Sequence, residues 1–320
     1  MSEHITASAP AKINAFLSVG PARSDGFHGL FTVFVALDLA GTVEVEFLAG
    51  WGADAVTADG PFAAGVPTDS SNLAARALAA LKKRCEETGR PAWGSAVARL
   101  TKNVPAAGGM AGGSADAAAA LRAGNAYLER RGAAFDEEEL RTIAASLGSD
   151  VPFALLGGAA AGSGRGERLT PIDAPHEFRW IAVPHQVSLP TPGVFTRLDE
   201  MRAAGTAPQP VRGRGEAARA LKAGDPERLG AALANDLAAP AMELRPGIAH
   251  TLLELRQLPG VTGVVVSGSG PTVVALLAGE EEQQAASEAL RSRGVEHLLA
   301  AGPAPGPGVI GGGREGGFGG

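Results

Sequence analysis

A glycine-rich segment, Pro105–Asp116, constrains this chain more than any other part of its sequence. It reads PAAGGMAGGSAD and holds four glycines within six residues, so its backbone can adopt positive φ and approach a ligand closely. The alanine run Ala117–Leu121 follows at once and favours a helix, with Ser114 and Asp116 placed to cap and begin it. Unpaired N–H groups at such a helix N-terminus attract phosphate. The segment therefore predicts a phosphate-binding loop.

Two commoner phosphate-binding motifs do not account for this loop. A P-loop requires Gly-Lys followed by Ser or Thr, and the sequence contains no Gly-Lys dipeptide. A dinucleotide fingerprint requires G-x-G-x-x-G, whereas Gly109 and Gly112 have only the G-x-x-G spacing. A flexible Gly/Ala linker is the alternative interpretation, but linkers are not usually followed by a strongly helix-forming run.

Length and composition limit the class of protein. With 320 residues the chain is long enough for two domains, and it has no apolar run of the length that spans a membrane. The single cysteine, Cys85, excludes an internal disulfide framework and is typical of a reducing cytoplasm, the location that we expect. A net charge of −6 argues against a nucleic-acid partner. An anionic substrate would therefore have to be held by local positive groups.

The order of strand and helix patterns indicates an α+β protein with mixed sheets and a cleft between two domains. We expect an N-terminal domain over residues 1–155, which contains the glycine-rich loop, and a C-terminal domain over residues 156–302. Residues 303–320 are rich in glycine and proline and poor in apolar side chains, which predicts a disordered tail.

Three separated segments resemble the GHMP kinase family: Ala9–Asn14 (APAKIN), the loop Pro105–Ser114, and Ser267–Thr272 (SGSGPT). The resemblance covers about residues 5–302 and implies the two-domain GHMP kinase fold, with ATP and Mg²⁺ as cofactors and a small-molecule alcohol as acceptor. Further motifs match one branch of that family in the expected order: Asp25–His28 (DGFH), Leu147–Phe153 (LGSDVPF), Leu189–Phe195 (LPTPGVF) and Asn235–Leu237 (NDL).

The branch resemblance implies a particular reaction. ATP would phosphorylate the 2-hydroxyl of 4-diphosphocytidyl-2-C-methyl-D-erythritol, a step of isoprenoid precursor biosynthesis, and the enzyme would be a monomer or homodimer without nucleic-acid or membrane partners. Another GHMP kinase, acting on homoserine or mevalonate, is one alternative. A non-catalytic GHMP-like metabolite sensor is another, but such a protein could lose Lys12 or Asp150, and both are present.

The resemblance assigns the chemistry to a few side chains. Lys12 would stabilise charge in the transition state, and Asp150 would accept the hydroxyl proton, although an Asp before Val-Pro is also a good helix cap. Phe27, His28 and Phe195 would hold the cytosine ring by stacking and hydrogen bonding, with core packing or a turn position as the alternative.

Binding roles for the remaining candidates follow from the same resemblance. Asn14 and Thr191 would bond polar groups of the acceptor, Lys102 and Asn72 would border the adenine, and Ser114 would bind the metal. The loop residues expected to hold the ATP phosphates are Pro105, Ala106, Ala107, Gly108, Gly109, Met110, Ala111, Gly112, Gly113, Ser114 and Ala115.

Some positions depart from the family pattern. Met110 and Ala111 stand where Leu and Gly are usual, and Phe27 stands where Tyr is usual. Arg165 lies in a glycine-rich stretch at a position that usually carries a small apolar residue.

Overall fold

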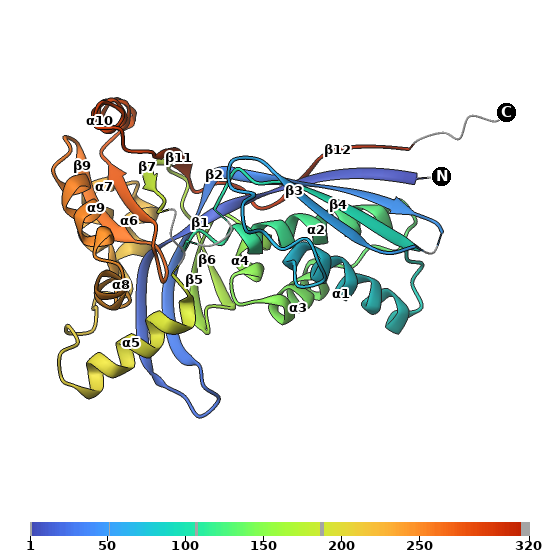
Figure 1. Ribbon diagram of the computed structural model, residues 1–320, viewed down its shortest axis with the longest axis horizontal. Helices are drawn as coiled ribbons and strands as arrows, with labels where there is room; N and C mark the ends of the chain where they lie inside the picture. The colour runs from blue at the N-terminus through green and yellow to red at the C-terminus, as the bar shows by residue number, and fades with distance from the viewer. Residues whose placement is uncertain (1, 51, 106–107, 186–188, 315–320) are drawn as a thin grey trace.

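The protein has two lobes joined by one long hairpin (Figure 1). The structure, a computed structural model, describes residues 2–50, 52–105, 108–185 and 189–314. Strand β1 (Ser2–Ala22) and strand β2 (His28–Leu48) pair antiparallel along their length and run from one lobe into the other. Each lobe has its own sheet with helices against it, which confirms the predicted α+β class. The domain boundary at residue 155 stays a prediction.

The N-terminal lobe is built on a mixed sheet in which, over the described residues, the strand order is β12-β1-β2-β4-β3. Strand β5 also pairs with β2, β6 pairs with β5, and the short β8 pairs with β1. These strands are β3 (Ala55–Asp59), β4 (Ser95–Thr101), β5 (Ala159–Gly164), β6 (Arg168–Ile172), β8 (Ala234–Asn235) and β12 (Gly308–Arg314). The helices of this lobe are α1 (Leu73–Thr88), α2 (Gly112–Glu129), α3 (Glu137–Leu147) and α4 (Val151–Leu156).

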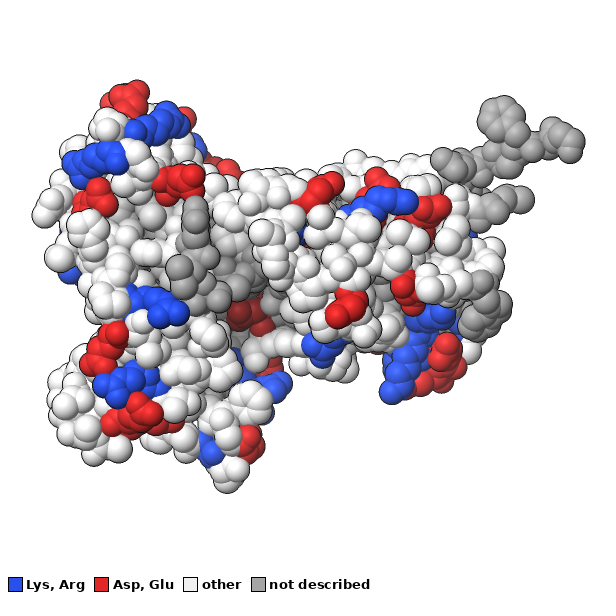
Figure 2. Space-filling view, viewed as in Figure 1, with Lys and Arg blue, Asp and Glu red and all other residues white. Residues whose placement is uncertain are grey.

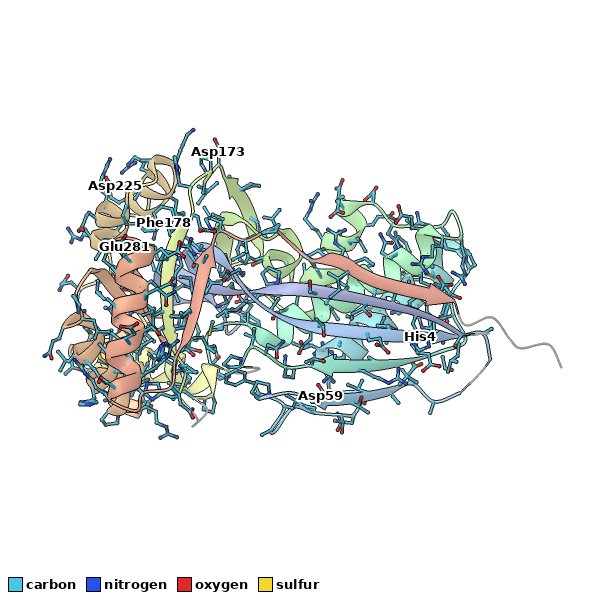
Figure 3. All side chains as sticks on the ribbon, turned by 90° about the horizontal axis from the view of Figure 1, so that it is seen from above. His4, Asp59, Asp173, Phe178, Asp225 and Glu281 are labelled. Atoms are coloured by element: carbon cyan, nitrogen blue, oxygen red, sulfur yellow. The ribbon has the colours of Figure 1, made fainter. Side chains whose placement is uncertain are left out.

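The C-terminal lobe has a second, antiparallel sheet in the order β11-β7-β10-β9. Its strands are β7 (Phe178–Val183), β9 (Val261–Val266), β10 (Val273–Leu277) and β11 (Leu298–Gly302). Its helices are α5 (Thr191–Ala203), α6 (Glu216–Ala223), α7 (Pro226–Ala232), α8 (Ala238–Leu244), α9 (Gly247–Arg256) and α10 (Glu280–Ser292). Seen from above, Glu281 on α10 and His4 on β1 lie at opposite ends of the molecule (Figure 3).

Helix α2 lies against β1 and β2 because its side chains are small. The alanines of the run Ala117–Leu121 are buried, together with Val43 and Val45 of β2, in one apolar core. Small side chains let the helix axis approach the sheet closely, and this places the start of α2 beside the middle of β1.

A local irregularity of β1 determines which side chains face the cleft. The register with β2 shifts between Pro10 and Ala11, where proline cannot donate a ladder hydrogen bond. Beyond the shift, the alternation of side chains along the strand puts Lys12 and Asn14 on one face.

Two sequence expectations about caps and tails are wrong. Helix α2 begins at Gly112, and its N-cap is Ala111 with φ 56° and no side-chain cap, so Ser114 lies inside the first turn instead of capping it. Residues 308–314 are not disordered, because β12 pairs antiparallel with β1 between Glu3 and Ser8. Backbone hydrogen bonds need no apolar side chains, so a glycine-rich strand carries little signal in its composition. The predicted disorder of residues 315–320 lies outside the described residues.

No helix in the described part of the chain is both long and apolar enough to cross a membrane. No group of three or more His, Cys, Asp or Glu side chains there is placed to hold a metal ion.

Candidate active site

A cavity of about 750 Å³ lies between the lobes. Its walls come from β1, β2, the glycine-rich loop, the start of α4, the β5–β6 turn, helix α5 and the turn between β9 and β10. The molecular surface is hollowed between the two lobes, on the side where the β1–β2 turn and α5 project (Figures 1 and 2). This volume lies in the range of cavities that enclose small-molecule ligands.

Lys12 is held at one end of this cavity by several oxygen atoms. Its Nζ donates to Asn14 Oδ1 at 2.7 Å and to the carbonyl oxygen of Gly109 at 2.8 Å, and it lies 3.6 Å from Asp150 Oδ2. The Lys12 side chain is only 5% exposed. A buried ammonium group whose neighbours are all fixed is suited to stabilising negative charge that develops on a bound ligand.

Asn14 links Lys12 to a buried hydrogen-bond network. Its Nδ2 donates to Thr32 Oγ1 at 2.7 Å, and that hydroxyl donates to the carbonyl of Phe16 at 2.8 Å. The backbone N–H of Asn14 donates to Ser267 Oγ at 3.3 Å. Asn14 and Thr32 both line the cavity, and the network fixes the position of the lysine.

Asp150 is the N-cap residue of α4, but its side chain makes no capping hydrogen bond. The carboxylate is 36% exposed and points toward Lys12, so it is open to a ligand in the cavity. The helix-cap interpretation thus accounts for the position of Asp150 at the start of α4, but not for the direction of its side chain, which points to Lys12 instead of capping the helix.

The glycine-rich loop has the backbone conformations that glycine allows. Gly108 and Gly109 have φ of 137° and 85°, and a Cβ at Gly109 would collide with the carbonyl of Ser267. Ser267 Oγ donates to the carbonyl of Gly109 at 2.8 Å, which ties the loop to the β9–β10 turn. The two backbones lie so close together that no residue with a side chain fits at position 109.

The loop residues predicted to bind phosphate divide into three groups. Gly108, Gly109, Ala111, Gly113 and Ser114 line the cavity. The other predicted residues that the structure describes are not among its lining residues: Pro105, Met110, Gly112 and Ala115. Ala106 and Ala107 lie outside the described residues.

Thr272 packs against this loop from the end of the β9–β10 turn. Its Oγ1 is buried and, within the described residues, has no hydrogen-bond partner. Its backbone N–H donates to the carbonyl of Gly108 at 3.2 Å, so the hydroxyl stands beside the loop. A buried hydroxyl without a partner costs free energy. Thr272 is fully buried and is not among the lining residues of the cavity, so a ligand phosphate would meet the loop at Gly108 and Gly109, which do line it.

The other end of the cavity is aromatic. His28 Nε2 lies 3.0 Å from both carboxylate oxygens of Asp199, and its ring lies 5.0 Å from that of Phe195 between centroids. Phe27 is 49% exposed at the β1–β2 turn, which is closed by a hydrogen bond from the N–H of Arg23 to the carbonyl of Phe27. All three predicted ring residues line the same cavity as Lys12 and Asp150.

Thr191 lies at the start of α5, where its Oγ1 is 2.8 Å from Ser269 Oγ. Both residues line the cavity, and the contact joins α5 to the β9–β10 turn. Asn235 supports that turn from outside the cavity, since its Nδ2 donates to the carbonyls of Val266 and Gly268 at 2.7 Å each.

Lys102 and Asn72 are not among the lining residues of the cavity. Lys102 is buried, forms an ion pair with Asp116 of α2 and donates to the carbonyl of Gly112 at 3.2 Å. Burial raises the pKa of the Asp116 carboxyl, and the lysine beside it only partly opposes that shift. Asn72 caps α1, with Oδ1 accepting from the N–H of Ala74 at 2.8 Å. Both side chains thus have structural partners that sequence reasoning did not anticipate.

Sequence reasoning also missed three residues of the site. Asp199 holds His28, and its position four residues after Phe195 is a usable signal because residues i and i+4 share a helix face. Thr32 has no comparable signal, since it meets its partner only through the fold, whereas Ser269 belongs to the SGSGPT segment, to whose residues no individual roles were given.

Comparison with known proteins identifies the family. The family model for the N-terminal domain of GHMP kinases matches residues 72–158, and the model for their C-terminal domain matches residues 217–296. A 4-diphosphocytidyl-2-C-methyl-D-erythritol kinase from Corynebacterium jeikeium is 40% identical over 337 residues, which cover 96% of this chain and 94% of that protein. The chain belongs to the GHMP kinases. The family predicted from the motifs is confirmed.

Further relatives align with this GHMP kinase along almost its full length. A protein of the same name from Saccharopolyspora erythraea is 44% identical over 308 residues, covering 96% of this chain and 94% of that protein. The crystal structure of a 4-(cytidine 5'-diphospho)-2C-methyl-D-erythritol kinase matches with a TM-score of 0.73 and 32% identity, covering 93% of this chain and 99% of that one. A homoserine kinase from Cytophaga hutchinsonii, 18% identical with a TM-score of 0.67, shares the fold.

Proposed function

We propose that this GHMP kinase uses ATP to phosphorylate the 2-hydroxyl of 4-diphosphocytidyl-2-C-methyl-D-erythritol, as the names of its relatives suggest. One observation carries the proposal: a single cavity holds the Lys12–Asp150 pair and the glycine-rich loop at one end and the His28–Phe195 pair at the other. The first end suits phosphoryl transfer, and the second suits a flat, polar base.

The reactive end can position the acceptor hydroxyl against ATP. The hydroxyl oxygen would bond to the γ-phosphorus while the bond to the β–γ bridging oxygen breaks, giving the phosphorylated acceptor and ADP. The hydroxyl proton would pass to the Asp150 carboxylate, which makes no helix-capping hydrogen bond. Lys12 would stabilise the charge that spreads over the transferred group.

The loop and the first turn of α2 would hold the ATP phosphates through backbone N–H groups. Ser114 lies in that turn and lines the cavity, and its hydroxyl would be the protein ligand of Mg²⁺. Bound magnesium would neutralise part of the phosphate charge.

The aromatic end would select the acceptor. Since a carboxylate only accepts hydrogen bonds, His28 would donate from Nε2 to Asp199, and in the tautomer with its proton on Nε2 the Nδ1 atom is an acceptor. That atom is suited to the exocyclic amino group of cytosine, while Phe195 and Phe27 offer ring faces. Binding of the base would position the distant hydroxyl for reaction.

An acceptor comparison tests the proposal. ADP release is measured by a coupled assay with the diphosphocytidyl acceptor, with methylerythritol phosphate, which lacks the cytidine and one of the two phosphates, with homoserine and with mevalonate. We expect rapid release with the first alone. Faster release with homoserine or mevalonate, or none with the diphosphocytidyl acceptor, would overturn the proposal.

A further inference from the structure

Arg165 lies at the tip of the turn between β5 and β6, and the turn is built to present it. The residues on either side, Gly164 and Gly166, have φ of 74° and 105°. The N–H of Arg165 donates to Glu167 Oε2 at 2.6 Å, and the N–H of Gly166 donates to the carbonyl of Ser163 at 3.0 Å. The backbone of this tip is therefore fixed, although its sequence is glycine-rich.

The guanidinium group of Arg165 reaches the cavity without a partner of opposite charge. It stands 5.0 Å from the centroid of the Phe27 ring, and Arg165 is one of the lining residues. Within the described residues, no carboxylate lies within ion-pair distance of it: Glu167 bonds the Arg165 backbone, and Asp199 bonds His28. Lys12, the other lysine or arginine among the lining residues, is already bonded.

The pairing of β2 and β5 locates Arg165 relative to the two ends of the cavity. Leu30 of β2 is opposite Gly164, so Arg165 follows immediately after this pair and lies on the side of β2 that leads to His28. Lys12 stands 5.7 Å from the ring of Phe34, farther along the same strand, and that ring also lies close to Gly166 of the turn. The contact with Phe27 is what places the guanidinium beside the aromatic end.

The proposed acceptor carries two phosphates directly attached to its cytidine. These charges enter a protein of net charge −6, and a guanidinium fork suits them because it can donate two parallel hydrogen bonds to phosphate oxygens. We infer that Arg165 binds the diphosphate of the acceptor while its other face rests on Phe27. This inference rests on the proposed function, and it makes Arg165 a residue that selects diphosphate-bearing acceptors.

Binding of cytidine, CMP and CDP separates a phosphate contact from support of Phe27. Affinities are measured by calorimetry for the wild type and for Arg165→Ala and Arg165→Lys, with excess ADP present to occupy the ATP site. We expect Arg165→Ala to weaken CDP about tenfold or more and cytidine less than about twofold, with CMP between them. Arg165→Lys should recover part of the CDP affinity, since it keeps the charge but not the fork.

The matched control is Arg168→Ala, three residues away on β6. Arg168 is an exposed arginine outside the cavity lining, and its removal changes the net charge equally. We expect CDP affinity unchanged in this variant and, in Arg165→Ala, a raised KM for the acceptor with kcat at saturation within about threefold.

Two results overturn the inference alone. Equal weakening of cytidine, CMP and CDP would show that Arg165 acts only through Phe27, and unchanged CDP affinity would show that it does not bind phosphate. Failure of the wild type to bind cytidine and CDP at all would instead overturn the proposed function.

Discussion

The two ends of the cavity are built differently. At the reactive end, Lys12, Asn14 and Thr32 are almost fully buried and joined by successive hydrogen bonds. At the aromatic end, Phe27 is half exposed, and Asp199, the partner of His28, is 40% exposed. The reactive end is a buried polar network beside the partly exposed carboxylate of Asp150, and the aromatic end is a turn and a helix face at which His28 is buried but Phe27 and Asp199 are open to water.

This difference suits the roles proposed for the two ends. Charge stabilisation in phosphoryl transfer needs groups already in place, because moving them during the reaction raises the barrier. Recognition of a base can gain its affinity from contacts that form when the ligand arrives, at the cost of ordering side chains such as Phe27. The two ends should therefore respond differently to substitution.

The largest effect is expected at Asp150. Asp150→Asn should lower kcat about a thousandfold or more, since the amide cannot accept the proton, while the KM for ATP stays within a few fold. The free energy of unfolding should change by less than about 1 kcal/mol, because the carboxylate makes no cap bond and Asn also caps helices well. Steady-state kinetics and urea unfolding measure the two effects.

Asp136→Asn is the matched control, since Asp136 caps α3 through bonds to the N–H groups of Glu138 and Glu139. It should leave kcat unchanged. If Asp150→Asn turned over about as fast as the wild type, Asp150 would serve only to begin helix α4 and would have no catalytic role.

The next largest effect is expected in the loop. Gly109→Val should raise the KM for ATP about a hundredfold, because its side chain collides with the carbonyl of Ser267 and resists positive φ. Gly132→Val is the control: Gly132 has φ 67° but open space around it, so only stability should fall. An unchanged ATP affinity in folded Gly109→Val would mean that the loop is a linker.

A smaller effect is expected at His28. Its replacement by alanine should weaken the diphosphocytidyl acceptor by about 1–3 kcal/mol, the range for a lost buried hydrogen bond, and leave ATP affinity within about twofold. His4→Ala, at the far end of β1 (Figure 3), should change neither. An equal loss of ATP affinity, or failure of free CMP and CDP to compete with the acceptor, would place the base elsewhere.

The smallest effect is expected at Phe27. Phe27→Tyr should change the acceptor KM less than about twofold, because the ring is kept and its half-exposed edge lets the added hydroxyl reach water. Phe27→Ala, by contrast, removes the ring face and the support of Arg165 and should raise that KM severalfold. A tenfold penalty in Phe27→Tyr would show that this end is as tightly packed as the reactive end.

Local sequence patterns predicted the individual elements of the site better than the contacts between them. Alternation along β1 placed Lys12 and Asn14 on one face, and the glycine and alanine run placed the loop before α2. The contact between Lys12 and Asp150 spans two segments far apart in the sequence, so the motif resemblance alone suggested it.

Sequence reasoning is weakest where one residue type has two common uses, and the adenine contacts expected of Lys102 and Asn72 stay predictions. Lys102 is a rare lysine near the loop, and only the fold shows that its partner is Asp116 of α2. Asn72 precedes a helix, where capping competes with ligand binding as the explanation. Strand β12 was missed because its pairing uses backbone groups, which every residue except proline supplies equally.

The position of β12 has a consequence for synthesis of the protein. A ribosome releases β1 first and residues 308–314 almost three hundred residues later, yet these segments are neighbours in one sheet. During that interval the outer edge of β1 between Glu3 and Ser8 has no β12 to accept its hydrogen bonds, and a free strand edge can pair with another chain. The nascent N-terminal lobe therefore carries an unpaired strand edge until its last strand emerges.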